Sequence, residues 1–176
     1  MEHELNPILT KLVGTNRRSI GKSNEVVVEV IADPSLFKII FEGMNCNDPV
    51  LRMRCADAVE KITIHYPEYL VPYKQQLINE ISKINQHEVR WHVAQLFSRL
   101  DLTNDERSAV LDILSDYLKD KSKIVKTFSM QALADIAEQD KGLRSSIIKK
   151  LEVLTQEGSP AMKSRGRKLL SKLKGK

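Results

Sequence analysis

The stretch that decides the fold runs from Pro49 to Val59 and reads Pro-Val-Leu-Arg-Met-Arg-Cys-Ala-Asp-Ala-Val. It aligns without gaps on three later stretches of the chain, residues 87–97, 123–133 and 160–170. A basic residue marks the same position in each copy, at steps of 38, 36 and 37 residues: Arg52, Arg90, Lys126 and Lys163. A fixed period between about 20 and 50 residues is the signature of a repeat protein.

Each copy has the apolar spacing of one face of a helix, as in Leu51, Cys55, Ala58 and Ile62. We expect the residue before the basic position to be buried in every copy: Leu51, Val89, Val125 and Met162. Another amphipathic run precedes each copy, at residues 36–44, 71–84, 106–118 and 143–154. Turn residues separate the two, so the repeating unit is predicted to be a helical hairpin.

A more degenerate copy opens the chain, with residues 6–13 as its first helix and residues 19–31 as its second. Val26 to Ile31 is a β-branched run that would suit a strand by propensity. No second segment of this kind exists to pair with it, so a helix is predicted here as well. An atypical first copy agrees with the need of repeat proteins for a capping unit at each end.

The segment Asp48 to Arg52, followed by Ala56 and Ala58, resembles the HEAT repeat family, with armadillo-type repeats as the near neighbour. The resemblance implies one all-α domain over residues 1–176, a right-handed superhelix of about four to five hairpins. The approximate repeats are residues 4–33, 34–66, 70–101, 104–138 and 142–174. The family commonly has an acid six residues before the basic position; Asp120 and Glu157 fit this pattern, whereas Cys46 and Ile84 do not.

The composition is that of an ordinary globular chain, with 41% hydrophobic and 29% charged residues among 176. Neither a signal peptide nor about 18 uninterrupted apolar residues is present, so we expect a cytoplasmic monomer with Cys46 and Cys55 reduced. Residues 141–176 hold eleven Lys and Arg against two Glu, a net charge of +9, which leaves −4 for the preceding residues. This segment attracts polyanions or is simply a solvated terminal helix.

Motifs for chemistry are incomplete. Asn16 to Ser23 ends like a phosphate-binding loop, but the first glycine of that motif is replaced by Asn16 and no strand precedes it. The four histidines and two cysteines have no metal-ligand spacing. We therefore predict no catalytic, cofactor-binding or metal-binding residue, and no enzymatic activity.

The concave face of such a superhelix is lined by the second helices, so side chains that point away from the core are the candidate binding residues. At about 100° per residue from Leu51, Met53 lies at about 200° and Asp57 at about 240°. Carried through the repeats, this face gives the predicted partner-binding residues Met53, Asp57, Trp91, Gln95, Arg99, Thr127 and Gln131. The alternative for Trp91, the only tryptophan, is a core position between neighbouring second helices.

Three functions are compatible with these features. The first is a scaffold that binds a protein or peptide on its concave face. The second is nucleic-acid binding, akin to HEAT-like alkylpurine DNA glycosylases, and a third is a lyase-like or regulatory module. The basic residues gather in the last repeat instead of following a groove, which favours the scaffold. Polyanion binding is predicted for Lys163, Arg165, Arg167, Lys168 and Lys172.

Overall fold

The structure is a computed structural model that describes residues 5–175. These residues form ten α-helices and no strand, which confirms the all-α prediction. The helices are α1 (Pro7–Thr10), α2 (Ser23–Ala32), α3 (Phe37–Gly43), α4 (Pro49–His65), α5 (Lys74–Asn79), α6 (His87–Phe97), α7 (Asn104–Tyr117), α8 (Lys123–Gln139), α9 (Arg144–Glu157) and α10 (Pro160–Lys174). Four 3-10 helices accompany them: η1 (Pro34–Leu36), η2 (Pro67–Tyr73), η3 (Ile81–Lys83) and η4 (Lys141–Leu143).

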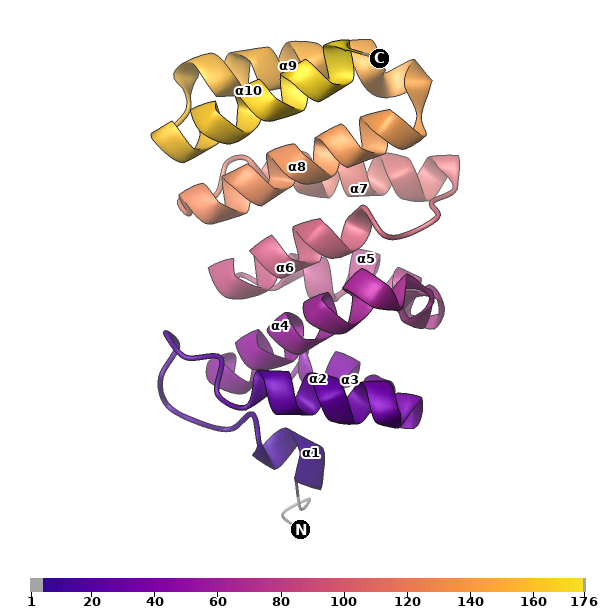
Figure 1. The fold of residues 1–176 in the computed structure, drawn as a ribbon, viewed down its shortest axis with the longest axis vertical. Coiled ribbons are helices and arrows are strands. Elements are labelled where there is room, and N and C mark those ends of the chain that lie inside the picture. The colour runs from indigo at the N-terminus through magenta and orange to yellow at the C-terminus, as the bar shows by residue number, and fades with distance from the viewer. Residues whose placement is uncertain (1–4, 176) are drawn as a thin grey trace. The chain divides into compact units, whose positions relative to one another are not determined.

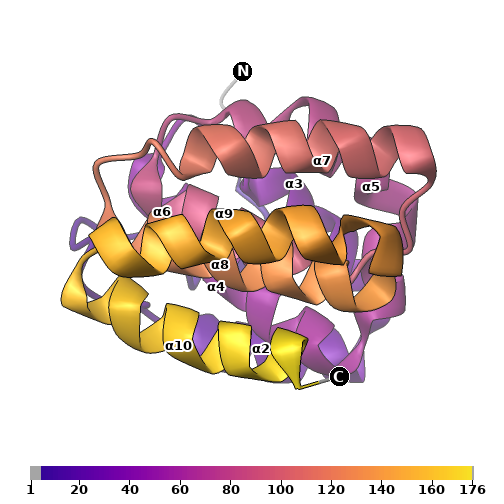
Figure 2. The ribbon, with the colours of Figure 1, turned by 90° about the horizontal axis from the view of Figure 1, so that it is seen from above.

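The chain divides into two compact units, Met1–Leu100 and Asp101–Lys176. In the first unit α4 packs between α2 and α6, and α3 packs on the other side of α4 (Figure 1). In the second unit α8 contacts α7, α9 and α10, and α9 lies alongside α10 (Figure 2). Within each unit, therefore, the second helices of the hairpins form one layer and the first helices form the other.

Local sequence signals start the second helices. Asp48, Ser122 and Ser159 each accept a hydrogen bond from the first turn of the helix that follows, and α4 and α10 also begin with proline. These side chains satisfy backbone N–H groups that have no partner inside the helix. At α7 the hydroxyl of Thr103 and the carboxylate of Glu106 form a capping box.

The predicted buried row is confirmed. Leu51, Val89, Val125 and Met162 retain exposed fractions of 4%, 0%, 0% and 5%. The β-branched run at residues 26–31 lies inside α2, where Val26 and Val30 are fully buried. Tertiary packing of one helix face thus overrides strand propensity, which is a weak preference on its own.

Two first helices are shorter than predicted. The helix expected at residues 6–13 is the single turn α1, and the run 71–84 is divided into the end of η2, α5 and η3. Pro72 lies inside η2 and supplies no backbone N–H, so α5 begins only at Lys74. Glu80, with φ −122° and ψ −64°, leaves helical geometry and ends α5. The segment keeps its burial through Leu77, Ile78 and Ile81.

The basic residues of the repeat are held by backbone where the family acid is absent. Arg52 donates two hydrogen bonds to the carbonyl oxygen of Cys46, at 2.9 and 2.6 Å, and Arg90 donates one to that of Ile84 at 3.1 Å. Both acceptors lie six residues before the arginine, where Cys46 and Ile84 replace the expected acid. The geometry of the repeat is thus retained while the acceptor changes from side chain to main chain.

Candidate binding surface

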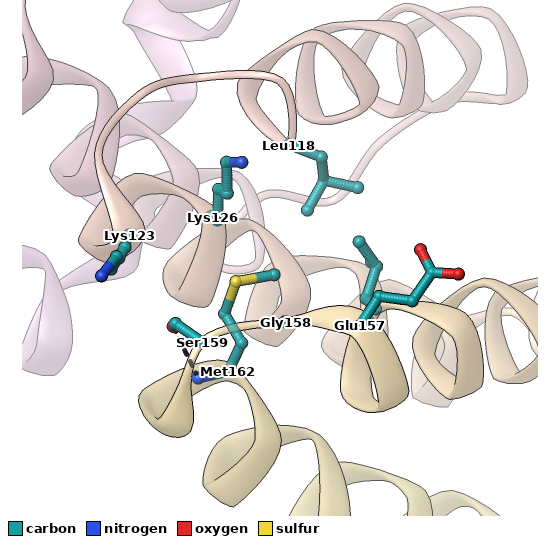
Figure 3. Close-up of a pocket in the computed structure, with 8 residues that line it drawn as sticks. Leu118, Lys123, Lys126, Glu157, Gly158, Ser159 and Met162 are labelled. Atoms are coloured by element: carbon teal, nitrogen blue, oxygen red, sulfur yellow. Dashed lines mark hydrogen bonds between the residues drawn. The ribbon is translucent and has the colours of Figure 1, made fainter.

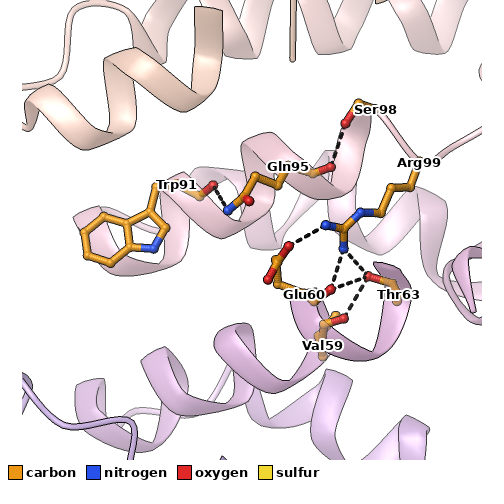
Figure 4. A network of polar contacts seen from close by, with 7 residues as sticks. All are labelled: Val59, Glu60, Thr63, Trp91, Gln95, Ser98 and Arg99. Carbon is orange, nitrogen blue, oxygen red and sulfur yellow. Dashed lines mark hydrogen bonds and ion pairs between the residues drawn. The ribbon is translucent and has the colours of Figure 1, made fainter. Parts of the chain in front are cut away.

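Polar side chains link neighbouring second helices across the layer of the first unit. Arg99, in the turn that follows α6, pairs with the carboxylate of Glu60 on α4 and donates a 2.7 Å hydrogen bond to the hydroxyl of Thr63 (Figure 4). The Arg99 and Glu60 side chains are only 18% and 12% exposed. Partly buried, charge-assisted bonds of this kind are stronger than exposed ion pairs. Arg99, predicted to contact a partner, thus stabilises the packing of α4 on α6.

A second linkage joins α2 to α4. Ser23 donates a hydrogen bond to the Asp57 carboxylate, which also pairs with Lys61 at 2.7 Å, and Lys61 donates to Asn24 at 2.8 Å. His92 of α6 is buried nearby. Its pKa depends first on this burial and then on the charges of Asp57, Lys61 and Arg99. Desolvation dominates and lowers the pKa of His92 to about 4. The imidazole is therefore neutral at pH 7.

The second unit repeats this design on α8 and α10. Arg165 donates to the amide oxygen of Gln131 at 2.8 Å, and Gln131 donates to Asp135 at the same distance. Lys172 pairs with Glu138 at 2.5 Å. Five of the predicted site residues thus bind neighbouring helices of their own unit: Arg99, Asp57, Gln131, Arg165 and Lys172.

The prediction that Met53 and Asp57 face a partner is wrong. Their exposed fractions are 6% and 9%, because α4 has a second helix on each flank as well as α3 behind it. A helix in a single hairpin buries one face, but α4 is stacked between two other second helices, which bury its flanks as well. Ile64 lies at about 220° on the same helix and is 54% exposed, although the sequence did not predict it as a binding residue.

Trp91 and Gln95 are half-buried on α6 and stay partly accessible. Trp91 projects away from the Arg99 network, and its ring lies 5.7 Å from that of His92 between centroids (Figure 4). Gln95 donates to the main-chain oxygen of Trp91 at 3.1 Å. Thr127 is half-buried on α8, where its hydroxyl donates a hydrogen bond to the main-chain oxygen of Lys123. The predicted row therefore keeps an accessible centre at Trp91.

The predicted basic residues gather on α10. Lys163, Arg167, Lys168 and Lys172 are exposed, whereas Arg165 is half-buried against Gln131. By formal charge the second unit carries sixteen Lys and Arg against eleven acids, and the first carries twelve of each. The excess positive charge of the chain therefore belongs to the second unit.

Chemistry-bearing clusters are sparse in the described part of the chain. Residues 5–175 contain no group of three or more His, Cys, Asp or Glu side chains placed to hold a metal ion. The loop that resembles a phosphate-binding loop turns its carbonyl groups inward, and Ser19, Asn16, Val13 and Leu12 accept hydrogen bonds from Arg54. Phosphate-binding loops present N–H groups instead. The centre of the loop is filled by a cation of the chain itself.

These stacked helical hairpins, tied together by side chains between equivalent helices, define a helical-repeat protein. Residues 12–173 match the model of the HEAT repeat domain, and the chain belongs to this family. Comparison with curated proteins and with solved structures gave no match. None of the helices formed by residues 5–175 has the length and apolar character needed to cross a bilayer.

Proposed function

We propose that the chain is a non-catalytic scaffold, a short right-handed superhelix of about four to five hairpins, that binds a protein partner on its layer of second helices. Membership of the HEAT repeat family supports this role, because such repeats generally mediate protein–protein interaction. The observation that carries the proposal is Trp91, a half-buried aromatic that stays partly accessible on that layer beside the amide of Gln95. Tryptophan offers a large contact area with little conformational freedom to lose, and is enriched among interface hot spots.

Replacement of Trp91 by alanine should reduce capture of the native partner at least tenfold while changing stability by less than about 1 kcal/mol, which is about 2–4 °C in melting midpoint. Trp91 is outside the fully buried core and stays partly accessible in the free chain, whereas at an interface its ring would become fully buried. The measurement is affinity capture from native lysate, with nuclease treatment, alongside a thermal melt of each protein.

Val71→Ala is the matched control, because Val71 is 64% exposed on η2, away from the layer of second helices. It should leave both capture and melting unchanged. If Trp91→Ala instead lowers the melting midpoint by many degrees, Trp91 is a core residue and the proposed site is elsewhere.

A second candidate function, binding of polyanions by α10, rests on the five exposed cations of that helix, of which Lys172 and Lys174 are in ion pairs. Changing Lys163, Arg167 and Lys168 together to glutamine should lower the salt concentration at which the protein elutes from heparin. With duplex DNA, the slope of log Kobs against log salt should fall by about 2–3, because each lost contact releases about one counterion fewer.

The control variant changes Arg17, Arg18 and Lys83 to glutamine, which removes the same charge from exposed positions of the first unit. Its elution should stay close to that of the unmodified protein. Equal losses in the two variants would mean that overall charge, not α10, governs retention.

A further inference from the structure

In the first unit, the space between two consecutive hairpin turns is filled by side chains. Arg52 on α4 donates a 3.1 Å hydrogen bond to the amide oxygen of Gln86, the residue before α6. The amide nitrogen of Gln86 donates in turn to the carbonyl oxygen of Pro49 at 2.8 Å. A guanidinium and an amide thus close this space, which we call the turn site.

In the second unit, the equivalents of Gln86 and Arg52 are a serine, which is shorter, and a lysine, which has no guanidinium group. In the alignment of the repeats, Lys126 is equivalent to Arg52, Lys123 to Pro49, and Ser159 to Gln86. The Ser159 hydroxyl is engaged with the backbone N–H of Met162, at 3.4 Å. A pocket of about 280 Å³ opens where Gln86 and Arg52 meet in the first unit. It is lined by Leu118, Lys123, Lys126, Leu154, Glu157, Gly158, Ser159 and Met162 (Figure 3).

The apolar walls confirm that this space is less filled than its counterpart. In the first unit, the equivalents of Leu118 and Leu154 are Met44 and Ile81, and both are 0% exposed. In the second unit Leu118 and Leu154 are only half-buried. The turn site of the second unit thus offers apolar surface that could cover an alkyl chain of a ligand, at about 25 cal/mol per Å² buried.

The polar groups of the pocket select the charge of a ligand. Among residues 5–175, neither the Lys123 nor the Lys126 ammonium group has an ion-pair partner, and the Glu157 carboxylate is exposed. The Lys123 carbonyl accepts a 2.7 Å hydrogen bond from the Thr127 hydroxyl, and the Pro49 carbonyl of the first unit accepts one from the amide of Gln86. A ligand therefore needs an acceptor for the lysines but no donor for the Lys123 carbonyl.

We propose that the turn site of the second unit binds the glutamate side chain of an acidic peptide segment. Its two methylene groups lie against Leu118 and Leu154, and its carboxylate meets the ammonium group of Lys126, with Lys123 beside it. Lys123 and Lys126 outweigh the single carboxylate of Glu157, so the lining has a net positive charge that favours a carboxylate over an amide. Aspartate is one methylene shorter and covers less of the apolar wall. This site is independent of the surface at Trp91.

The test is a titration of the ¹⁵N-labelled full chain, followed by amide chemical shifts at Gly158 and Ser159. The probes are three capped tripeptides, alanine–X–alanine with X as glutamate, glutamine or lysine. The glutamate peptide should shift these amides with an affinity at least fivefold above that of the glutamine peptide, and the lysine peptide should not bind.

Ser159→Gln is the decisive variant, because it restores the side chain that fills the turn site of the first unit and leaves every charge in place. It should weaken binding of the glutamate peptide at least fivefold, while retention on heparin by α10 stays unchanged. Lys126→Gln should weaken binding to a similar extent, and it serves alone if Ser159→Gln disturbs the start of α10. Binding that survives both variants, or shifts confined to the exposed face of α10, would overturn the proposal.

Discussion

Arg54→Ala should lower the free energy of unfolding by about 3 kcal/mol or more and release the loop between α1 and α2 from the first unit. Arg54 is 5% exposed and donates four hydrogen bonds of 2.8–3.2 Å to the carbonyl oxygens of Leu12, Val13, Asn16 and Ser19. Bonds from a charged donor contribute about 1.5–3 kcal/mol each before the cost of burying the guanidinium is subtracted. Alanine at position 54 removes all four hydrogen bonds, so the carbonyl groups of the loop lose their shared donor.

Two glycines show how closely the loop surrounds this side chain. A Cβ added at Gly14 would lie 2.5 Å from Nη1 of Arg54, and one added at Gly21 would lie 2.7 Å from it. Gly21 also has φ +58°, which residues with a side chain rarely adopt. Arg54→Lys should therefore also be destabilising, because an ammonium cannot reach carbonyl groups on several sides at once.

Urea unfolding gives the free energy, and amide hydrogen exchange of residues 12–22 reports the loop. Arg17→Ala, an exposed change in the same loop, should alter neither. If Arg54→Ala leaves exchange of the loop unchanged, the carbonyl cage contributes little and water replaces the guanidinium without loss.

Acidification from pH 7 to pH 4.5 should cost the folded chain about 2–3 kcal/mol through His92 alone. Burial lowers the pKa of His92 to about 4, against about 6.5 for an unfolded histidine. Between these pKa values the unfolded chain binds more protons than the folded chain. The free energy of unfolding therefore decreases as the pH falls. The stabilisation is complete above about pH 6.5 and is lost on the way down to about pH 4.

The structural cause lies in what surrounds the ring. Its Nδ1 atom is buried and has no hydrogen-bond partner, and Lys61 and Arg99 oppose protonation, while Asp57 alone favours it. His92→Gln removes this titration. The decrease in unfolding free energy between pH 7 and pH 4.5 should then be about 2–3 kcal/mol smaller than in the unmodified chain.

Carboxylates also titrate in this range, so the comparison needs a control. His65→Gln, at an exposed position in α4, should leave the pH dependence as it is. Equal pH profiles for His92→Gln and the unmodified chain would show that His92 takes up its proton in the folded state without cost.

The sequence by itself determined the repeat, its family and the residues that each hairpin buries between its own helices. Leu51, Val89, Val125 and Met162 followed from spacing alone, because a helix with one buried face repeats its apolar residues at three and four positions. The start of α4 at Asp48 and Pro49 was equally readable, since capping depends on a few adjacent residues.

Only the tertiary structure decided which polar residues are available to a partner. Met53 and Asp57 are buried, and Arg99 is bound to Glu60, because second helices pack flank to flank. Arg99 and its partners on α4 are 36–39 residues apart in the sequence, so the helical spacing of apolar residues does not predict this contact. The same holds for Arg54, whose acceptors are backbone carbonyls of a distant loop and carry no side-chain signal. The open turn site is lined by residues of several helices and has the short Ser159 where the first unit has Gln86, so it exists only once these helices pack together.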